Sequence, residues 1–235
     1  MRYLGGKSKN AKEIAAIVNA SRGPGASFWE PFCGGLSVSV QLAKHGPGVV
    51  SDGFLPLVSL YRAVRDGWEP PGVVSREEHA AARLLPDTDP RKAFIGFGCS
   101  FGGKWFDVYA KNDPKNSDDF ARASGNAVKR DVKAIARCAL EHLDFLDVTP
   151  EPLPIVIYAD PPYAGTEPYR GTKPFDSDRF WALVQGWERV DVPVFVSEYA
   201  CPVAHLVFWE KAHTLQLSGG QKKGARLEKL FRVIV

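Results

Sequence analysis

Residues 26–65 alternate between short apolar runs and helical patterns, and this alternation limits the possible folds of the chain more than any other feature. The successive segments are a strand, a glycine-containing turn, a helix, a second strand and a second helix, over residues 26–30, 31–35, 36–45, 49–52 and 56–65. Strand, helix, strand, helix is the βαβ pattern, which builds a parallel sheet. The chain is therefore expected to be an α/β protein.

The remaining chain predicts an insertion followed by more strands. Between residues 66 and 144 there are few β-branched runs, many charges and several prolines, which predicts a mostly helical insertion. Afterwards one helix, at 177–190, lies among strand patterns at 145–148, 155–160, 194–197, 206–209, 213–217 and 230–235. The crowded last strands favour an antiparallel edge on an otherwise parallel sheet. We therefore predict a core of residues 1–65 and 145–235 that is interrupted by residues 66–144.

The composition is that of a soluble, folded protein. Hydrophobic residues make up 45% of the 235 residues and charged residues 24%, which is ordinary for a globular protein with a packed core. The chain has neither a secretory signal pattern nor an apolar run of about 18 residues, so we expect it to be cytoplasmic. The cysteines are spaced too widely for a zinc or dithiol site, so we expect no metal; they are Cys33, Cys99, Cys138 and Cys201.

The net charge of +3 hides a basic stretch near the C-terminus. In this stretch a single acid, Glu228, lies among five basic residues, which are Lys222, Lys223, Arg226, Lys229 and Arg232. Such a stretch weakly favours a polyanionic partner, and a solvated surface is an equally good interpretation.

The tetrapeptide Asp160-Pro161-Pro162-Tyr163 directly follows a strongly apolar strand. In open α/β sheets, ligands bind at the carboxyl ends of the strands. The exocyclic amino group of a base is a poor nucleophile because its lone pair is delocalised into the ring, so a catalyst needs acceptors that hold the amino hydrogens. The Asp160 carboxylate and the Pro161 carbonyl can accept them, and Tyr163 can stack on the base. A proline-rich surface turn is the alternative interpretation.

A second candidate feature is the first strand-to-helix turn, with the sequence Glu30-Pro31-Phe32-Cys33-Gly34-Gly35-Leu36-Ser37. Its glycines let a cofactor approach the backbone, but the spacing differs from the Gly-x-Gly-x-x-Gly fingerprint, which disfavours a nicotinamide enzyme. Asp52 ends the next strand, about 20 residues on, where an acidic residue binds a ribose hydroxyl in nucleotide-binding folds. A solubilising aspartate in a turn is the alternative interpretation of Asp52.

Together with the opening Tyr3-Leu4-Gly5-Gly6-Lys7 and with Leu60-Tyr61, these motifs have the order found in Dam-type (D12 class) DNA adenine methyltransferases, which the chain resembles. The resemblance implies a Rossmann-like class I methyltransferase sheet with a mostly helical inserted target-recognition domain. It also implies S-adenosylmethionine as the cofactor and double-stranded DNA as the partner. The sequence does not give the oligomeric state, although we favour a monomer. The enzyme would transfer a methyl group to the exocyclic amino group of a flipped adenine. A restriction-modification context is implied, but the sequence identifies neither a recognition sequence nor a partner nuclease.

The resemblance also assigns roles to residues. The catalytic residues would be Asp160, Pro161, Pro162 and Tyr163. The cofactor-binding residues would be Tyr3, Lys7, Glu30, Phe32, Cys33, Gly34, Asp52 and Asp160. The loop at 164–176 would close over the extruded base, and the basic stretch would hold backbone phosphates with strong salt dependence. Candidate DNA-binding residues are therefore Lys104, Tyr169, Arg170, Lys173, Lys222, Lys223 and Arg226.

The chain departs from the family pattern in two places. The turn has Gly34-Gly35-Leu36, whereas the family more often has a glycine, a small residue and a second glycine. Residues 98–105 do not match the Asn-Arg-x-Gly-x-Asn-Gly-like stretch of the family, so its contacts cannot be transferred. If this segment faces DNA, Lys104 would contact phosphate and Trp105 would stack or wedge, although a core position suits Trp105 at least as well.

Two alternatives stay open. Related tetrapeptides occur in methyltransferases that act on guanine amino groups of ribosomal RNA or on glutamine side chains. Asp160 argues against the glutamine class, and the opening motif and the long insertion argue against the RNA class. Cytosine amino groups are disfavoured because their enzymes usually have Ser-Pro-Pro-Tyr. The second alternative is a non-catalytic DNA-binding module on the same scaffold, which the presence of Lys7, Asp52, Asp160 and Tyr163 disfavours.

Overall fold

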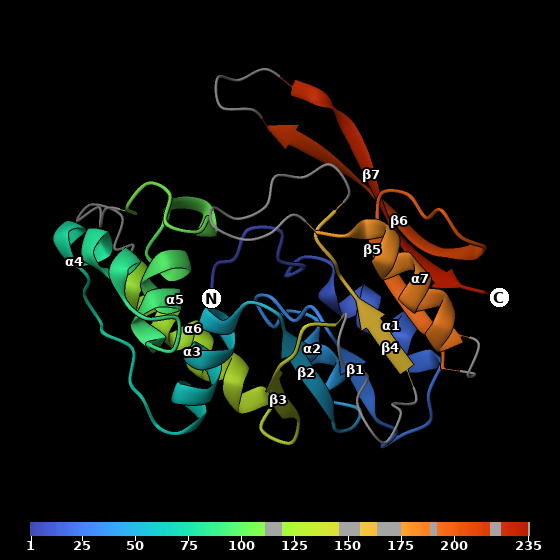
Figure 1. The fold of residues 1–235 in the computed structure, drawn as a ribbon, viewed down its shortest axis with the longest axis horizontal. Coiled ribbons are helices and arrows are strands. Elements are labelled where there is room, and N and C mark those ends of the chain that lie inside the picture. Colours follow the sequence, from blue (N-terminus) through green and yellow to red (C-terminus); the bar gives the residue numbers. More distant parts are fainter. Residues whose placement is uncertain (111–118, 146–155, 164–174, 189–191, 217–221, 235) are drawn as a thin grey trace.

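The computed structural model describes residues 1–110, 119–145, 156–163, 175–188, 192–216 and 222–234. Within them, seven strands form one sheet in the order β3-β2-β1-β4-β5-β7-β6 (Figure 1). The strands are β1 Phe28–Glu30, β2 Gly48–Asp52, β3 Ala139–His142, β4 Val156–Ala159, β5 Val194–Glu198, β6 His205–Gln216 and β7 Lys222–Val233. The first five strands are parallel, and β7 is antiparallel to both β5 and β6. This order confirms the Rossmann-like class I methyltransferase sheet and its antiparallel edge.

Helices cover both sides of this sheet. The α-helices are α1 Ala11–Ala20, α2 Ser39–Leu42, α3 Leu55–Arg65, α4 Arg76–Ala81, α5 Pro90–Gly98, α6 Phe120–Ala134 and α7 Ser177–Glu188, and the 3₁₀ turns are η1 Ala82–Leu84 and η2 Phe101–Gly103. Figure 1 shows α3 to α6 gathered at one end of the molecule and the ribbon of β6 and β7 extending from the other. None of the helices in the described ranges is long and apolar enough to cross a membrane.

The central strand β4 is buried on both faces, as its continuous apolar sequence requires. Val156 and Tyr158 point into a core that includes side chains of α1, α2 and α3. Ile157 and Ala159 point to the opposite face, where they join a second core with α7. Because alternate side chains of a strand point to opposite faces, the sheet is held between two hydrophobic layers. The loops at its carboxyl edge are therefore anchored to a rigid element.

The structure corrects three sequence-based predictions. The helix predicted over 36–45 is the single turn α2, because the chain remains a tight turn up to residue 38. A strand was predicted at 145–148, but Phe145 lies in a turn and residues 146–148 fall outside the described ranges. The two strands predicted at 206–209 and 213–217 are one strand, β6, with two irregularities in its pairing to β7.

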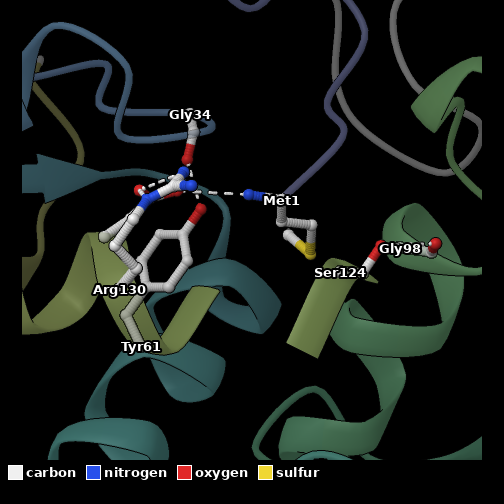
Figure 2. Close-up of polar contacts among 7 residues, drawn as sticks. Met1, Gly34, Tyr61, Gly98, Ser124 and Arg130 are labelled. Carbon is white, nitrogen blue, oxygen red and sulfur yellow. Dashed lines mark hydrogen bonds and ion pairs between the residues drawn. The ribbon is translucent and has the colours of Figure 1, made fainter. Parts of the chain in front are cut away.

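The range predicted as an insertion contributes to the sheet as well as to the helices. Residues 66–144 contain α4, α5 and α6, but also β3, which pairs with β2. Arg62 of α3 fixes this strand by donating two hydrogen bonds to the Leu140 carbonyl. In the first half of α6, Ser124 donates to the Gly98 carbonyl (Figure 2), and near the end of the helix Asp131 pairs with the amino group of Met1. The division into a core and a separate recognition region stays a prediction.

Candidate active site

The strands β2, β1 and β4 end side by side, and a predicted motif follows each of them. β1 leads into the Gly34-Gly35 turn, β2 ends at Asp52, and β4 is followed by Asp160. All three strands are parallel, with β1 between the other two, so the three motifs gather at one edge of the sheet. The chain leaves β1 towards β2 on one side, whereas β4 lies on the other side. This is the topological switch point at which open α/β sheets bind ligands.

The peptide groups around Gly34 are held from both sides of the backbone. The Gly34 N–H donates to Asp52 Oδ2 over 2.9 Å, and the buried Tyr61 hydroxyl donates to the Gly34 carbonyl over 2.5 Å (Figure 2). The other oxygen of Asp52 accepts the N–H of Phe54 over 2.9 Å. Thus the end of β2 and helix α3 together fix the turn after β1. The motif Leu60-Tyr61, noted from the sequence, acts here through the tyrosine hydroxyl.

The ring of Tyr3 packs directly on this turn, which explains why both residues are glycines. A Cβ atom at Gly34 would lie 2.9 Å from Tyr3 Cε1, and one at Gly35 would lie 2.9 Å from Tyr3 Cβ. Gly34 also has a positive φ of 43°. The Tyr3 ring also contacts Phe97 of α5, with ring centroids 4.8 Å apart. The opening motif and the glycine turn, which the sequence separates by about 30 residues, therefore form one surface.

Leu36 occupies the position where the family more often has its second glycine, and it adopts a left-handed conformation with a φ of 63°. A branched side chain is strained in this region of the backbone map. The Leu36 side chain is nevertheless 1% exposed and lies in the core formed with α1, α2 and α3. Burial of this side chain compensates for the backbone strain, so the turn keeps its shape without the glycine.

Three further predicted cofactor residues have side chains that contact the core rather than the edge. Glu30 is buried and accepts a hydrogen bond from Ser39 Oγ over 2.5 Å, and burial raises the pKa of Glu30 well above its ordinary value. Cys33 is buried beside Asp52, with Sγ 4.0 Å from Oδ2, and burial raises the pKa of the Cys33 thiol. The Phe32 ring packs against Phe145 at a centroid distance of 4.7 Å. Their roles in cofactor binding stay predictions.

Four side chains form a polar cluster at the end of β4, which we call the charged cluster: Lys7, Asp160, Tyr163 and Glu228. Lys7 Nζ lies 2.7 Å from Asp160 Oδ1 and 3.2 Å from Glu228 Oε1, and it points to the Gly5 carbonyl at 3.4 Å. The Tyr163 hydroxyl donates to Glu228 Oε1 over 2.8 Å. Lys7 Nζ also lies 4.8 Å from the centroid of the Tyr163 ring. The side chains of Lys7 and Glu228 are only 9% and 5% exposed.

Burial and neighbouring charges shift the pKa values in the charged cluster. Burial alone would lower the pKa of Lys7, but the carboxylates of Asp160 and Glu228 outweigh burial and raise it. Burial raises the pKa of Asp160, an effect that Lys7 opposes and Glu228 strengthens. Burial and the same two carboxylates raise the pKa of Tyr163, so its hydroxyl stays a proton donor. With two carboxylates and one ammonium group, the cluster has a formal excess of negative charge.

Glu228 was not among the residues predicted for the site. The sequence shows Glu228 as a lone acid among five basic residues, a signal that marks it as unusual but does not connect it with Lys7 or Tyr163. Its backbone in β7 pairs with Lys211 of β6, and its side chain is directed to Lys7, near the other end of the sequence. Only the three-dimensional contact identifies Glu228 as part of the charged cluster.

The structure separates the candidate DNA-binding residues into groups. Lys104 is exposed and lies 3.8 Å from Asp107 in a loose ion pair. Trp105 is partly buried and packs against the core beside Phe97 and Phe54, with centroid distances of 4.7 and 4.9 Å. The exposed ring of this segment is Phe101, at 67%. The other candidates, whose side chains lie outside the described ranges, are Tyr169, Arg170, Lys173, Lys222, Lys223 and Arg226.

A cavity of about 590 Å³ lies beside the opening motif. Its lining includes Tyr3, Gly6 and Gly35, together with residues of α1, α2 and α6, but neither Asp52 nor Asp160. Tyr3 contributes both to this cavity and to the cover of the Gly34-Gly35 turn. The predicted cofactor and catalytic residues thus gather along the sheet edge, and the cavity adjoins them at Tyr3.

The fold and the motifs at its switch point define the class of the protein: it is a methyltransferase. Residues 3–96 match the model of one family in particular, the D12 class N6 adenine-specific DNA methyltransferases. The match confirms, for this segment, the resemblance inferred from the sequence, and it indicates S-adenosylmethionine as the cofactor. The matched range includes the opening motif, the glycine turn and Asp52, and it ends before the tetrapeptide at 160–163.

Several solved structures are similar over most of the chain. A conserved hypothetical protein of Streptococcus pyogenes is 13% identical, covers 93% of this chain and 94% of its own, and has a TM-score of 0.37. Precorrin-6y C5,15-methyltransferase from Geobacter metallireducens GS-15 is 8% identical, with coverages of 95% and 88% and a TM-score of 0.39. The protein SMU.472, complexed with SAH, is 13% identical, with coverages of 97% and 52% and a TM-score of 0.40. No curated protein matches the sequence.

Proposed function

We propose that this chain is a DNA adenine methyltransferase that transfers a methyl group from S-adenosylmethionine to the exocyclic amino group of an adenine flipped out of duplex DNA. The observation that carries the proposal is the 2.7 Å contact between Lys7 and Asp160. Lys7 belongs to the segment that matches the adenine-specific family, whereas Asp160 belongs to the tetrapeptide beyond it. This ion pair joins the cofactor-side motifs and the base-side motif in one site.

The residues at the sheet edge fit S-adenosylmethionine. Each oxygen of Asp52 accepts one backbone N–H, Oδ2 also contacts the Cys33 thiol, and a ribose hydroxyl can bond to the second lone pair of Oδ1. The Gly34-Gly35 turn presents backbone without side chains, so a ligand can approach closely. The formal excess of negative charge in the charged cluster suits a positively charged sulfonium group. When bound, the cofactor supplies an electrophilic methyl group.

The tetrapeptide is suited to activate an amino group. The Asp160 carboxylate and the Pro161 carbonyl accept the two amino hydrogens, which draws the nitrogen lone pair out of conjugation with the ring. The bound cofactor would supply the methyl group to the amino nitrogen and keep on its sulfur the electron pair of the broken C–S bond, and one amino proton would be released. Asp160 is placed to accept this proton, and its raised pKa makes it a better base than an exposed aspartate.

Tyr163 and the insertion supply the nucleic-acid side of the proposal. The Tyr163 ring is partly exposed and is held by its hydroxyl and by an edge contact with Tyr199, at a centroid distance of 4.6 Å. Such a ring can stack on an extruded base, as enzymes that act on flipped bases require. We assign duplex recognition to residues 66–144, where Lys104 is available for a phosphate and Phe101 for a base step.

The decisive experiment supplies labelled S-adenosylmethionine with unmethylated DNA, RNA and protein in parallel, followed by nucleoside mass spectrometry of the labelled product. The proposal predicts methylation of the adenine amino group in DNA. Label in RNA alone would replace the proposal by a ribosomal-type enzyme. DNA binding without label in any acceptor would replace it by a binding module. Labelled cytosine would keep the proposed site and reaction but change the base that is methylated from adenine to cytosine.

A further inference from the structure

We propose that Glu228 is a positioning residue of this site, which fixes the Tyr163 ring and the Lys7 ammonium group in the places that catalysis needs. This inference rests on the proposed function. It starts from the contact geometry: one carboxylate oxygen, Oε1, accepts the Tyr163 hydroxyl over 2.8 Å and lies 3.2 Å from Lys7 Nζ. One buried acid thus joins the stacking residue of the tetrapeptide to the lysine of the opening motif.

The backbone of Glu228 is held more rigidly than any loop could hold it. Strand β7 lies between β5 and β6 and is hydrogen-bonded to both. Glu228 pairs with Lys211 of β6, and the next residue, Lys229, pairs with Glu198 at the end of β5. Residues on paired strands are placed more accurately than residues on loops. The sheet therefore provides a fixed anchor for Tyr163 and Lys7, which both lie outside helices and strands.

The contact with Tyr163 controls the direction of its ring. A tyrosine ring turns about its bonds to the backbone unless its hydroxyl or its faces are held. In this site the hydroxyl is bound to Glu228 and the ring meets Tyr199 edge-on, at an interplanar angle of 76°. If Tyr163 stacks on the extruded base, Glu228 sets the plane on which the base comes to lie.

The contact between Glu228 and Lys7 controls how strongly Lys7 pairs with Asp160. Lys7 directs its ammonium group to both carboxylates, at 2.7 Å for Asp160 and 3.2 Å for Glu228. Without Glu228, the lysine would pair with Asp160 alone, and Asp160 would be a weaker acceptor for an amino hydrogen of the base. Glu228 therefore shares the lysine and leaves Asp160 available.

The test compares Glu228→Gln, which keeps an acceptor oxygen but removes the charge, with Glu228→Ala, which removes both. We expect kcat to fall by about 10-fold for the glutamine variant and about 100-fold for the alanine variant, as for loss of a hydrogen bond to a charged group. Binding of S-adenosylmethionine should also weaken, by no more than about 10-fold, because one of the two negative charges that suit the sulfonium group is lost, so kcat is measured at saturating cofactor. Glu210→Gln, an exposed position on neighbouring β6, is the matched control and should keep the wild-type kcat.

Two readouts distinguish positioning from a general structural effect. In a Tyr163→Phe background the hydroxyl bond is already absent, so Glu228→Gln should lower kcat by a smaller factor than in the wild type. The acid limb of the profile of kcat/KM against pH should also move. Among the described residues, the titratable groups that interact with Asp160 are Lys7, Glu228, Tyr163, Tyr158 and Glu30. Because Glu228 raises the pKa of Asp160, its removal should shift the acid limb to lower pH.

The possible failures are separable. An inactive wild-type chain would overturn the proposed function itself. An active wild type with equally active Glu228 variants would overturn the role of Glu228 alone. The role of Glu228 would also be overturned if Glu228→Gln and Tyr163→Phe reduce kcat independently and the acid limb of the pH profile does not move. Glu228 would then only support the fold. If the alanine variant does not fold, the glutamine variant and the double variant still decide the question.

Discussion

Asp52 accepts the backbone N–H of Gly34 over 2.9 Å, so the residue expected to bind the cofactor ribose also shapes the turn beside it. One carboxylate thus has two tasks at the sheet edge. A substitution at Asp52 removes a ligand contact and loosens the turn at the same time, whereas a substitution of Tyr61, which holds the other side of the Gly34 peptide, loosens the turn only.

We expect Asp52→Asn to weaken S-adenosylmethionine binding by at least about 10-fold, because the amide must direct an N–H group at a backbone donor or at the ribose hydroxyl. Tyr61→Phe should weaken binding by only about threefold, through the turn. Titration calorimetry with both variants measures the two constants. Equal losses in the two variants would show that Asp52 acts through the turn and contributes no ribose contact.

We expect Asp160→Ala to reduce methyl transfer by at least about 10²-fold while DNA association changes by no more than a few-fold. The reason is that Asp160 accepts an amino hydrogen during the reaction, whereas DNA affinity comes mainly from phosphate contacts elsewhere. Single-turnover methylation and a fluorescence binding assay measure the two quantities. Asp178→Ala, at an exposed position on α7, is the control. Retained turnover in the Asp160 variant would remove this residue from the catalytic role.

At Leu36 we predict that a glycine substitution is less destabilising than an alanine substitution, which is the reverse of the usual order. Its φ of 63° is easy for glycine and strained for alanine, by about 1–2 kcal/mol. Leu36→Ala should cost about 2–5 kcal/mol in the free energy of unfolding, because the side chain is buried. Leu36→Gly should be more stable than Leu36→Ala by about 1 kcal/mol, although glycine normally ranks lower. Urea unfolding of both variants measures the order, and a more stable alanine variant contradicts the strain argument.

Glu30 predicts how stability depends on pH. Burial, and then the charges of Asp160 and Asp52, raise the pKa of Glu30 well above its ordinary value of 4.5, whereas Ser39 opposes the shift. Above pH 4.5 the unfolded chain therefore releases this proton while the folded chain keeps it. The folded state binds more protons, so the contribution of Glu30 to stability falls as the pH rises, by at most about 1.4 kcal/mol per pH unit.

The neutral variant Glu30→Gln has no such titration. We expect the free energy of unfolding of the wild type, relative to this variant, to decrease between about pH 5 and about pH 8. Urea unfolding at several pH values measures the difference. Parallel profiles for the two proteins would mean that Glu30 titrates normally in the folded state.

The insertion gives a prediction about DNA binding. If Lys104 contacts a backbone phosphate, Lys104→Ala should weaken binding to all sequences alike and reduce the slope of log affinity against log salt by about 1. Lys44→Ala is the matched control, since Lys44 is an exposed lysine outside residues 66–144 that donates to Gln41. Binding isotherms at several salt concentrations measure both slopes. An unchanged slope for Lys104→Ala would exclude the phosphate contact.

The sequence was sufficient to predict the parallel core and to place Asp52 and the tetrapeptide at the same edge of the sheet. Those predictions depend on local alternation and on the rule that parallel strands place their carboxyl ends together. The sequence was insufficient for β3, because only Leu140 of its four residues is buried and the strand therefore lacks an apolar pattern. The strand was predicted instead at 145–148, which begins with the aromatic residue Phe145. Packing, which local patterns do not report, also decided that Trp105 packs against the core and that Phe101 is the exposed ring.

Glu228 was missed for a different reason. Its partners Lys7 and Tyr163 lie far away in the sequence, and no spacing rule connects β7 with the opening loop. The contact exists because β7 is inserted between β5 and β6, which places its buried acid beside the end of β4. Non-local strand pairing of this kind becomes visible only in three dimensions.

The position of β7 also has a consequence for biosynthesis. Because β7 separates β5 from β6, strand β6 has no partner in the sheet until the later strand β7 has been made. A nascent chain that ends before β7 therefore has Lys7 and Asp160 but not the acid that joins Lys7 to Tyr163. Strand β7 can take its place in the sheet only after both β5 and β6 have been made. On the ribosome, the sheet would close and the charged cluster would be completed in a single late event.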